Sequence, residues 1–319
     1  MTEFHELIKF IRSEVNNSLK NLKIPDTPNY LYSPIRYAID AKGKRFRPIL
    51  VHLAGRAGKI DLDVLMNISL AIELLHNFTL VHDDIMDNDT VRHGKMTIHE
   101  KWDSSTAILA GDGIYTLAQI ILNDLPNNVN EVSRYFNSTT LEICEGQALD
   151  KEFENDLSIT EEMYMDMVEK KTGALLGASA VLPAIYNGEK TKTLESYEQY
   201  GRCLGIAFQI HDDLLEVTAD KKTMGKSLGS DIAEGKQTIM AIKARKKFPD
   251  QWNKLIENPN KPESFKNICM FFKETGIIEE TRSIASSYFN SSLEYLKNLD
   301  GINTNELTQL VELIEKRTY

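Results

Sequence analysis

The spacing of apolar residues is the feature of this 319-residue chain that most restricts its fold. Apolar side chains recur every three or four residues nearly throughout, as in helices, whereas the alternating pattern of strands is scarce. We therefore predict an all-α protein. A helix is expected to begin at Ser33-Pro34 and to end near Gly43, and longer helices are expected over residues 61–87, 104–124, 129–150, 160–186, 191–217 and 231–247.

The predicted helices follow one another without a recognisable linker. Proline and glycine are scattered, and the polar stretches are short. A composition of 42% hydrophobic and 26% charged residues is ordinary for a globular protein, and a chain of this length can bury a large core. We predict that residues 1–319 form a single domain.

Charge and composition exclude several classes of protein. A net charge of −10 argues against a surface that binds nucleic acid or an anionic membrane. The 3 cysteines are few and far apart, as expected in a reducing compartment. The start of the chain lacks the features of a signal peptide, and the longest apolar run, residues 173–185, is too short to span a bilayer. We expect a cytoplasmic protein without a transmembrane segment.

Two similar acidic motifs are the strongest indication of function. They are LVHDDIMD at residues 80–87 and QIHDDLLE at residues 209–216, and each ends a mostly apolar helix. At 100° per residue, Asp83 and Asp87 lie within about 40° of each other, and Asp84 lies about 100° further around. Two carboxylates of the first motif therefore point in the same direction.

The second motif has the same layout, with Gln209, Asp212 and Glu216 on one face of a helix. Carboxylates brought so close together repel one another unless a cation lies between them. Mg²⁺ prefers oxygen ligands and commonly takes one or two carboxylates, with water and substrate phosphates completing its coordination. Solvated acidic helix ends are the alternative, but both motifs interrupt apolar helices.

Basic residues lie close to the acidic motifs in the sequence. A basic segment, AKGKRFRP at residues 41–48, contains Lys42, Lys44, Arg45 and Arg47, and a solvated basic turn is its alternative interpretation. Further basic and glycine residues follow the first motif at Arg92, His93, Gly94 and Lys95, and the second at Lys221, Lys222, Gly225, Lys226 and Lys236. Carboxylates for a metal beside cations for phosphate indicate a site that binds a diphosphate through bridging Mg²⁺.

Seven segments together carry a resemblance to a known family. They are, in order, GKRFRP, LVHDDIMDNDTVRHG, AILAGDGIYTLA, EGQALD, EKKTGALL, FQIHDDLLE and GKSLGSDIAEGKQT. The chain resembles the trans-isoprenyl diphosphate synthases, and most of all their archaeal-type geranylgeranyl diphosphate synthases. The resemblance implies the isoprenoid synthase fold, which is a single-domain helical bundle around a central cavity, and usually a homodimer.

The resemblance also implies roles for individual residues. Asp83, Asp87 and Asp212 would ligate Mg²⁺ with support from Asp84 and Asp213, and three Mg²⁺ ions would be present with substrate bound. Isopentenyl diphosphate would be bound by Gly43, Lys44, Arg47, His76 and His93. The allylic diphosphate would be bound by Arg92, Gln147, Asp150, Lys171, Thr172, Gln209, Lys226 and Lys236.

The implied activity is the condensation of isopentenyl diphosphate with dimethylallyl, geranyl or farnesyl diphosphate, through ionisation, condensation and elimination. In the family, side chains before the first motif limit product length; here they are Phe78, Thr79 and Leu75. An aromatic at the fifth position before Asp83 resembles the enzymes that make the C20 product, geranylgeranyl diphosphate. Farnesyl diphosphate or a C25 product is the alternative, and Phe78 could instead be an ordinary core residue.

One departure and three competing functions remain. His93 stands where most relatives carry arginine, so we expect isopentenyl diphosphate to bind less tightly at high pH. A terpene cyclase would not need the basic segment, and a non-catalytic subunit would usually have lost one acidic motif. An HD-type phosphohydrolase is disfavoured because His82 points about 100° away from Asp83 on a helix.

Overall fold

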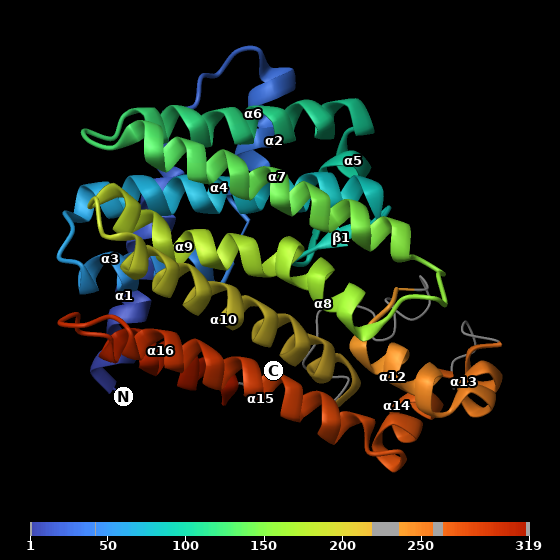
Figure 1. Cartoon of the computed structure of the whole chain (residues 1–319). Helices are drawn as coiled ribbons and strands as arrows, with labels where there is room; N and C mark the ends of the chain where they lie inside the picture. Colours follow the sequence, from blue (N-terminus) through green and yellow to red (C-terminus); the bar gives the residue numbers. More distant parts are fainter. Residues whose placement is uncertain (1, 42, 219–235, 258–263, 317–319) are drawn as a thin grey trace. The chain divides into compact units, whose positions relative to one another are not determined.

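The computed structural model describes residues 2–41, 43–218, 236–257 and 264–316, which are almost entirely helical (Figure 1). The prediction of an all-α fold is confirmed. The elements are α1 (Thr2–Lys20), α2 (Asn29–Ile39), α3 (Phe46–Ala57), α4 (Leu62–Met86), β1 (Val91–Arg92), β2 (Lys95–Met96), α5 (Ile98–Lys101), α6 (Ser104–Asn123), α7 (Val129–Phe153), α8 (Glu161–Val168), the π-helix η1 (Glu169–Gly173), α9 (Ala174–Tyr186), α10 (Thr191–Thr218), α12 (Ile239–Lys247), α13 (Pro249–Ile256), α14 (Ser264–Glu274), α15 (Ile277–Lys297) and α16 (Asn305–Glu315).

The chain divides into two compact units, each made of three discontinuous segments. The first unit comprises Met1–Thr140, Leu175–Glu198 and Asn298–Gln309, and the second comprises Leu141–Ala174, Gln199–Lys297 and Leu310–Tyr319. The first acidic motif lies in the first unit and the second motif in the second unit. The single domain expected from the sequence stays a prediction.

Helix α4 forms the core of the first unit and packs mainly against α6 and α3. Because it is apolar on nearly all sides, residues such as Leu65, Ile68 and Ile72 are completely buried. Glycine allows the close approach on both sides: a Cβ atom at Gly55 would lie 2.1 Å from Leu65, and one at Gly111 would lie 2.2 Å from His82. The helix that ends in the first motif is therefore held firmly along its length.

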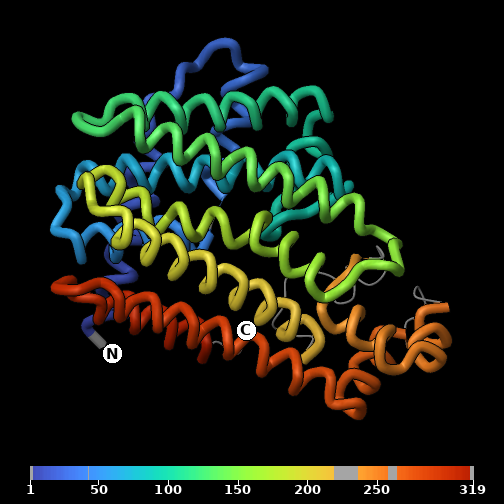
Figure 2. The backbone as a smooth tube through the Cα atoms, viewed as in Figure 1, coloured from blue at the N-terminus to red at the C-terminus, as the bar shows by residue number. Residues whose placement is uncertain are grey.

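The second unit has its own hydrophobic core, built by α8, α10 and the helices from α12 to α15. Trp252 of α13 stacks on Phe272 of α14, with ring centroids 5.5 Å apart. The second half of α10 runs beside α15 (Figure 2). The rings of His211 on α10 and Phe289 on α15 meet edge to face, with centroids 6.2 Å apart. The second motif is thus carried by a helix packed into this core.

Most predicted helices match the observed ones within a few residues, but the start predicted at Ser33 is wrong. Helix α2 already begins at Asn29, because the carbonyl of Pro28 accepts the first hydrogen bonds of the helix, from the N–H of Leu31 at 3.1 Å and from that of Tyr32 at 3.2 Å. Pro34 lies inside α2, where it cannot donate the hydrogen bond to the carbonyl four residues earlier. The helix also ends before the predicted glycine.

The helix predicted from residue 231 begins later in the described part of the chain, at Ile239. Residues 236–238 are not helical, because the hydroxyl of Thr238 accepts the N–H of Ala241 at 3.3 Å and caps α12 there. Residues 231–235 lie outside the described ranges.

By length and composition, α4 and α6 could each cross a membrane; no other described helix meets that test. In α4, 67% of the most apolar 18-residue window is buried within the protein, compared with 39% in α6. Such helices are weak indications of a membrane protein, because the core helices of soluble proteins have the same properties.

Candidate functional site

The first acidic motif occupies the last two turns of α4 and its C-cap, Asp87. The N–H of Asp87 donates to the carbonyl of Asp83 at 2.8 Å and ends the helix there. The side chains of Asp83 and Asp87 are half-buried, whereas Asp84 is only 6% exposed. The negative end of the helix dipole disfavours carboxylates in a last turn, so this arrangement favours a bound cation.

Asp84 is held by Arg92, which lies on the short hairpin that follows the motif. Arg92 pairs with Lys95 across the hairpin, and positive φ angles at His93 (51°) and Gly94 (75°) form its turn. The guanidinium of Arg92 donates from Nε to Asp84 Oδ1 and from Nη2 to Asp89, the latter at 2.7 Å. Burial raises the pKa of Asp84 despite the opposing effect of Arg92.

The predicted basic segment is anchored by a buried ion pair between Arg45 and Glu73 of α4, each 5% exposed at the side chain. Arg45 has a left-handed backbone (φ 53°) and caps the start of α3. Its guanidinium also donates to the carbonyl of Ala41 at 2.6 Å and to Asn16 Oδ1 at 2.9 Å. The turn that carries Lys44 and Arg47 is thereby fixed to α4.

Cationic side chains surround His76, which lies on α4 about one turn before the first acidic motif begins. Arg47 Nη1 lies 3.1 Å from His76 Nε2. Burial lowers the pKa of His76 well below its usual value, and the positive charges of Arg47, His93, Arg92 and Arg45 lower it further. His76 is therefore neutral at pH 7, in a cationic neighbourhood that suits an anionic ligand.

Gly43 and Lys44 lie in the same turn; Gly43 is half-buried and Lys44 is exposed. The carbonyl of Lys44 accepts a hydrogen bond from Arg12 Nε at 3.1 Å. Lys42, the remaining lysine of the basic segment, lies outside the described residues. In the first unit, the structure thus brings together most of the residues predicted to bind isopentenyl diphosphate.

The second motif occupies the last two turns of α10. Asp212 and Glu216 are half-buried and share a helix face, whereas Asp213 is 7% exposed. Asp213 Oδ1 accepts from Gln209 Nε2 at 2.9 Å, and Oδ2 accepts from the hydroxyl of Tyr164 at 2.7 Å. Here too the second aspartate is buried while the first and last carboxylates are accessible.

The π-helix η1 carries two of the predicted diphosphate ligands, Lys171 and Thr172. Lys171 Nζ lies 2.5 Å from Asp150 Oδ2, and the hydroxyl of Thr172 donates to Gln209 Oε1 at 3.2 Å. A Cβ atom at Gly146 would lie 2.4 Å from the backbone nitrogen of Lys171, so α7 crosses η1 in direct backbone contact. Single-turn π-helices of this kind are common at functional sites.

Of the other predicted ligands of the second unit, the structure describes Gln147 and Lys236. Gln147 is 7% exposed, and neither atom of its amide has a hydrogen-bond partner among the described residues. Lys236 is half-buried and directly precedes Gln237, whose side chain accepts from Arg245 at 2.6 Å. Lys226 lies outside the described residues.

Of the three residues predicted to limit product length, Phe78 is in ring contact with α6. Leu75 is completely buried, and the hydroxyl of Thr79 donates to the carbonyl of His76 at 2.9 Å. The half-buried ring of Phe78 lies 5.3 Å from the ring of Tyr115 on α6, measured between centroids. Tyr115 was not predicted to have a role, although it lies within one of the motif segments.

No group of three His, Cys, Asp or Glu side chains within the described ranges has the geometry of a preformed metal site. The half-buried carboxylates of Asp83, Asp87 and Asp212 nevertheless supply hard oxygen ligands at the negative ends of two helices. They fit Mg²⁺, which needs only one or two protein carboxylates when a phosphate ligand completes its coordination.

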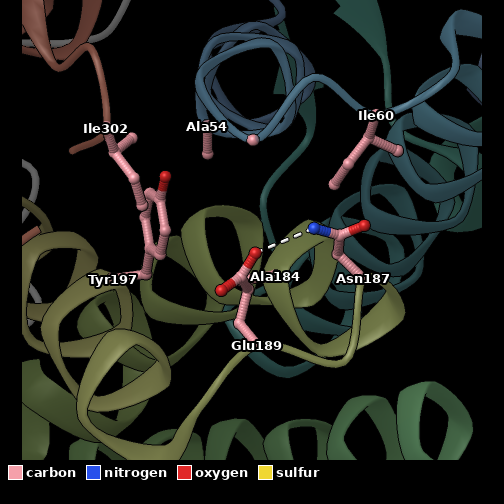
Figure 3. Close-up of a pocket in the computed structure, with 8 residues that line it drawn as sticks. Ala54, Ile60, Ala184, Asn187, Glu189, Tyr197 and Ile302 are labelled. Carbon is pink, nitrogen blue, oxygen red and sulfur yellow. Dashed lines mark hydrogen bonds between the residues drawn. The ribbon is translucent and has the colours of Figure 1, made fainter. Parts of the chain in front are cut away.

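A separate small cavity lies in the first unit and holds none of the predicted site residues (Figure 3). Its volume is about 10 Å³, room for about one water molecule. The hydroxyl of Tyr197, a residue only 2% exposed, points into it in Figure 3. Burial, reinforced by the charge of Glu189, raises the pKa of Tyr197 to about 12.

Comparison with known proteins identifies the family. Residues 28–271 match the family described as polyprenyl synthetase. The chain is 38% identical over 296 residues to the geranylgeranyl diphosphate synthase of Methanosarcina mazei, covering 92% of this chain and 86% of that protein. It is 37% identical to the geranylfarnesyl diphosphate synthase of Natronomonas pharaonis, covering 94% and 93% of the two chains.

A solved structure agrees with this result. The geranylgeranyl pyrophosphate synthetase of Pyrococcus horikoshii superimposes with a TM-score of 0.89 at 33% identity, and the match covers 99% of each chain. The chain belongs to the polyprenyl synthetase family.

Proposed function

We propose that this protein is a short-chain trans-prenyltransferase that condenses isopentenyl diphosphate with allylic diphosphates. The observation that carries the proposal is the repeated layout of the two acidic motifs. Each ends an apolar helix, buries its second aspartate and leaves two carboxylates half-buried on one face. Relatives named geranylgeranyl diphosphate synthase, 38% identical in one case, support the same function.

Asp83, Asp87 and Asp212 are the proposed Mg²⁺ ligands, with Asp84 and Asp213 holding the two helix ends in shape. Three Mg²⁺ ions per active site are proposed when substrate is bound. When bound, Mg²⁺ neutralises the diphosphate and stabilises it as a leaving group. Arg92, Lys171 and Thr172 would hold the same diphosphate with Gln147, Asp150, Gln209, Lys226 and Lys236.

The second substrate, isopentenyl diphosphate, is proposed to bind at Lys44, Arg47 and His76, with Gly43 and His93 beside them. The cationic side chains around neutral His76 support this assignment, because they attract an anion while the imidazole can still accept or donate a hydrogen bond. Fixing this diphosphate positions the alkene, and such positioning replaces a bimolecular encounter by an intramolecular one.

The proposed reaction begins with cleavage of the allylic carbon–oxygen bond, whose electron pair leaves with the diphosphate. Arg92 and Lys171 would stabilise the negative charge that develops on the leaving group. The alkene of isopentenyl diphosphate then forms the new carbon–carbon bond, and the resulting cation loses a proton, which the released diphosphate can accept. No side-chain nucleophile takes part.

The C20 compound geranylgeranyl diphosphate is the proposed main product. Phe78 supports this length, because its ring is packed against Tyr115 and is thus fixed as a barrier five residues before Asp83. Farnesyl diphosphate and a C25 product remain the alternatives, and the Natronomonas relative is named for the C25 compound.

Replacing Phe78 by alanine should lengthen the product by about one C5 unit, because the side chain that limits growth is removed. The measurement is the size of the dephosphorylated products by chromatography, with Leu65→Ala, at a completely buried position of the same helix, as the control for general loosening. An unchanged product distribution in Phe78→Ala would show that Phe78 does not limit product length.

A homodimer and a cytoplasmic location are also proposed. Helix α6 exposes a stripe of large apolar residues, with Ile108, Leu109 and Ile120 between 45% and 52% exposed, and a second copy of the chain could cover it.

The proposed function is tested by incubating the purified protein with Mg²⁺, labelled isopentenyl diphosphate and each allylic diphosphate in turn. We expect elongation with at least one starter, ending mainly at C20, and none when the metal is chelated. The absence of elongation with every starter would overturn the proposal.

A further inference from the structure

The buried aspartate of the second motif is held on both sides by hydrogen bonds. Tyr164 of α8, 2% exposed, donates its hydroxyl to Asp213 Oδ2 at 2.7 Å. Gln209, one turn earlier on α10, donates to Asp213 Oδ1 at 2.9 Å. Because both carboxylate oxygens accept hydrogen bonds, the carboxylate is fixed in orientation.

Tyr164 is itself rigidly held. Its ring belongs to the same buried cluster as Ile210 and Leu214, which lie on α10 on either side of the motif's aspartates. At the start of α8, Glu161 accepts a hydrogen bond from Lys243 of α12 at 2.8 Å, and Lys243 is only 8% exposed. The hydroxyl therefore reaches Asp213 from a packed helix rather than from a loop.

The same contact connects the motif to the predicted diphosphate ligands. Helix α8 continues directly into η1, which carries Lys171 and Thr172. Thr172 donates to Gln209 at 3.2 Å, and Gln209 donates to Asp213. Hydrogen bonds therefore connect Tyr164 to Asp213, Asp213 to Gln209, and Gln209 to Thr172. Thr172 is in turn joined to Tyr164 by the chain itself, from η1 back to α8.

We propose that Tyr164 is the positioning residue of the second acidic motif. By fixing Asp213, its hydroxyl sets the rotation of the last turns of α10, so that Asp212 is presented to a divalent cation. It also ties that helix end to the segment that carries Lys171. The inference rests on the proposed function, since it assumes that the motif binds metal.

The test uses the full-length protein and measures binding of Mn²⁺, in the presence of inorganic pyrophosphate, by electron paramagnetic resonance. Tyr164→Phe keeps the ring and removes only the hydroxyl. We expect a 10- to 100-fold loss in Mn²⁺ affinity, the range usual for residues that orient metal ligands. The steady-state Mg²⁺ requirement for elongation should rise in parallel.

The matched control is Tyr197→Phe, which removes a hydroxyl equally buried, at 2% exposure of the residue, but pointing into the small cavity of Figure 3. This variant should bind Mn²⁺ as the wild type does. If both variants lose affinity equally, or if Tyr164→Phe does not fold, the hydroxyl has only a general structural role and the proposal is overturned.

A double-mutant cycle distinguishes action through Asp213 from an independent effect. If Tyr164 acts through Asp213, then Asp213→Asn and the double variant with Tyr164→Phe should bind Mn²⁺ equally weakly. Additive losses would overturn the proposal. A wild-type protein that binds no Mn²⁺ and elongates no substrate would instead refute the proposed function, whereas normal wild-type binding with an unaltered Tyr164→Phe would refute this inference alone.

Discussion

The two acidic motifs share a layout but differ in what holds their buried aspartate. In the first motif, Asp84 pairs with the guanidinium of Arg92. In the second motif, its counterpart Asp213 accepts hydrogen bonds from Tyr164 and Gln209, at 2.7 and 2.9 Å. An ion pair changes the local charge as well as the geometry, whereas hydroxyl and amide donors mainly fix the geometry.

The surroundings of the first motif extend this contrast. The buried Arg45–Glu73 pair anchors the basic segment, and the charges of Arg47 and its neighbours lower the pKa of His76. The region around the first motif is therefore organised mainly by charge. The region around the second motif is organised by directed hydrogen bonds near the π-helix η1. This difference predicts that the first region responds more strongly to charge removal and to pH.

The largest stability effect is expected from Glu73→Gln, which leaves the guanidinium of Arg45 buried without its counter-charge. Breaking a buried ion pair from one side typically costs about 3–5 kcal/mol in the free energy of unfolding. The control is Glu306→Gln, which breaks an ion pair with Arg56 in which the side chains are 31% and 40% exposed, and should cost less than about 1 kcal/mol. Urea denaturation compares the two.

If Glu73→Gln and Glu306→Gln lower the free energy of unfolding equally, the region around the first motif is not organised mainly by charge. Replacing both members of the buried pair, as in Arg45→Met with Glu73→Leu, should recover part of the lost stability, since no uncompensated charge remains buried.

A slightly smaller loss in the free energy of unfolding is expected when the pH is lowered, because of the buried His52 on α3. Burial, aided by the charge of Arg56, lowers the pKa of His52 from 6.5 to about 4. The unfolded chain binds a proton at this residue first, so the associated stability is complete above about pH 6.5 and is lost as the pH falls through about 4. The shift corresponds to about 3 kcal/mol in the free energy of unfolding.

The measurement for His52 is urea denaturation of the wild type and His52→Gln at pH 7 and at about pH 4. The variant should lose less stability between the two pH values, because it cannot take up this proton. Parallel pH profiles for the two proteins would show that another group controls the acid sensitivity.

The smallest effect is expected from His93→Arg. A histidine loses its charge within the physiological pH range, whereas arginine keeps it. Since His93 lies in the cationic neighbourhood of His76, the substitution should lower the Michaelis constant for isopentenyl diphosphate a few-fold at pH 8 and less at pH 6. An unchanged Michaelis constant for isopentenyl diphosphate at pH 8 would show that His93 does not contribute to binding this substrate.

The sequence predicted the helices well because apolar periodicity reports burial directly. It also predicted the first and last carboxylates of each motif on one face, as helical geometry requires. The half-buried Asp83 and Asp87 occupy such a face at the end of α4.

Other features could not be read from the sequence. Tyr164 has the spacing of a core aromatic, and periodicity does not reveal which acceptor its hydroxyl meets. The π-helix at Lys171 inserts an extra residue into a turn without any mark in the composition. Arg45 has a left-handed backbone, and its side chain contacts Asn16 and Glu73, which are distant in sequence.

The central claim is that both acidic motifs act in one metal-dependent elongation. It is tested most directly by single-turnover condensation of farnesyl and isopentenyl diphosphates at saturating Mg²⁺ in Asp83→Asn and Asp212→Asn, with Asp112→Asn, a carboxylate that is 62% exposed, as the control. We predict that each motif variant loses at least about 100-fold in rate while the control is unaffected. Elongation at the wild-type rate in either motif variant would contradict the claim.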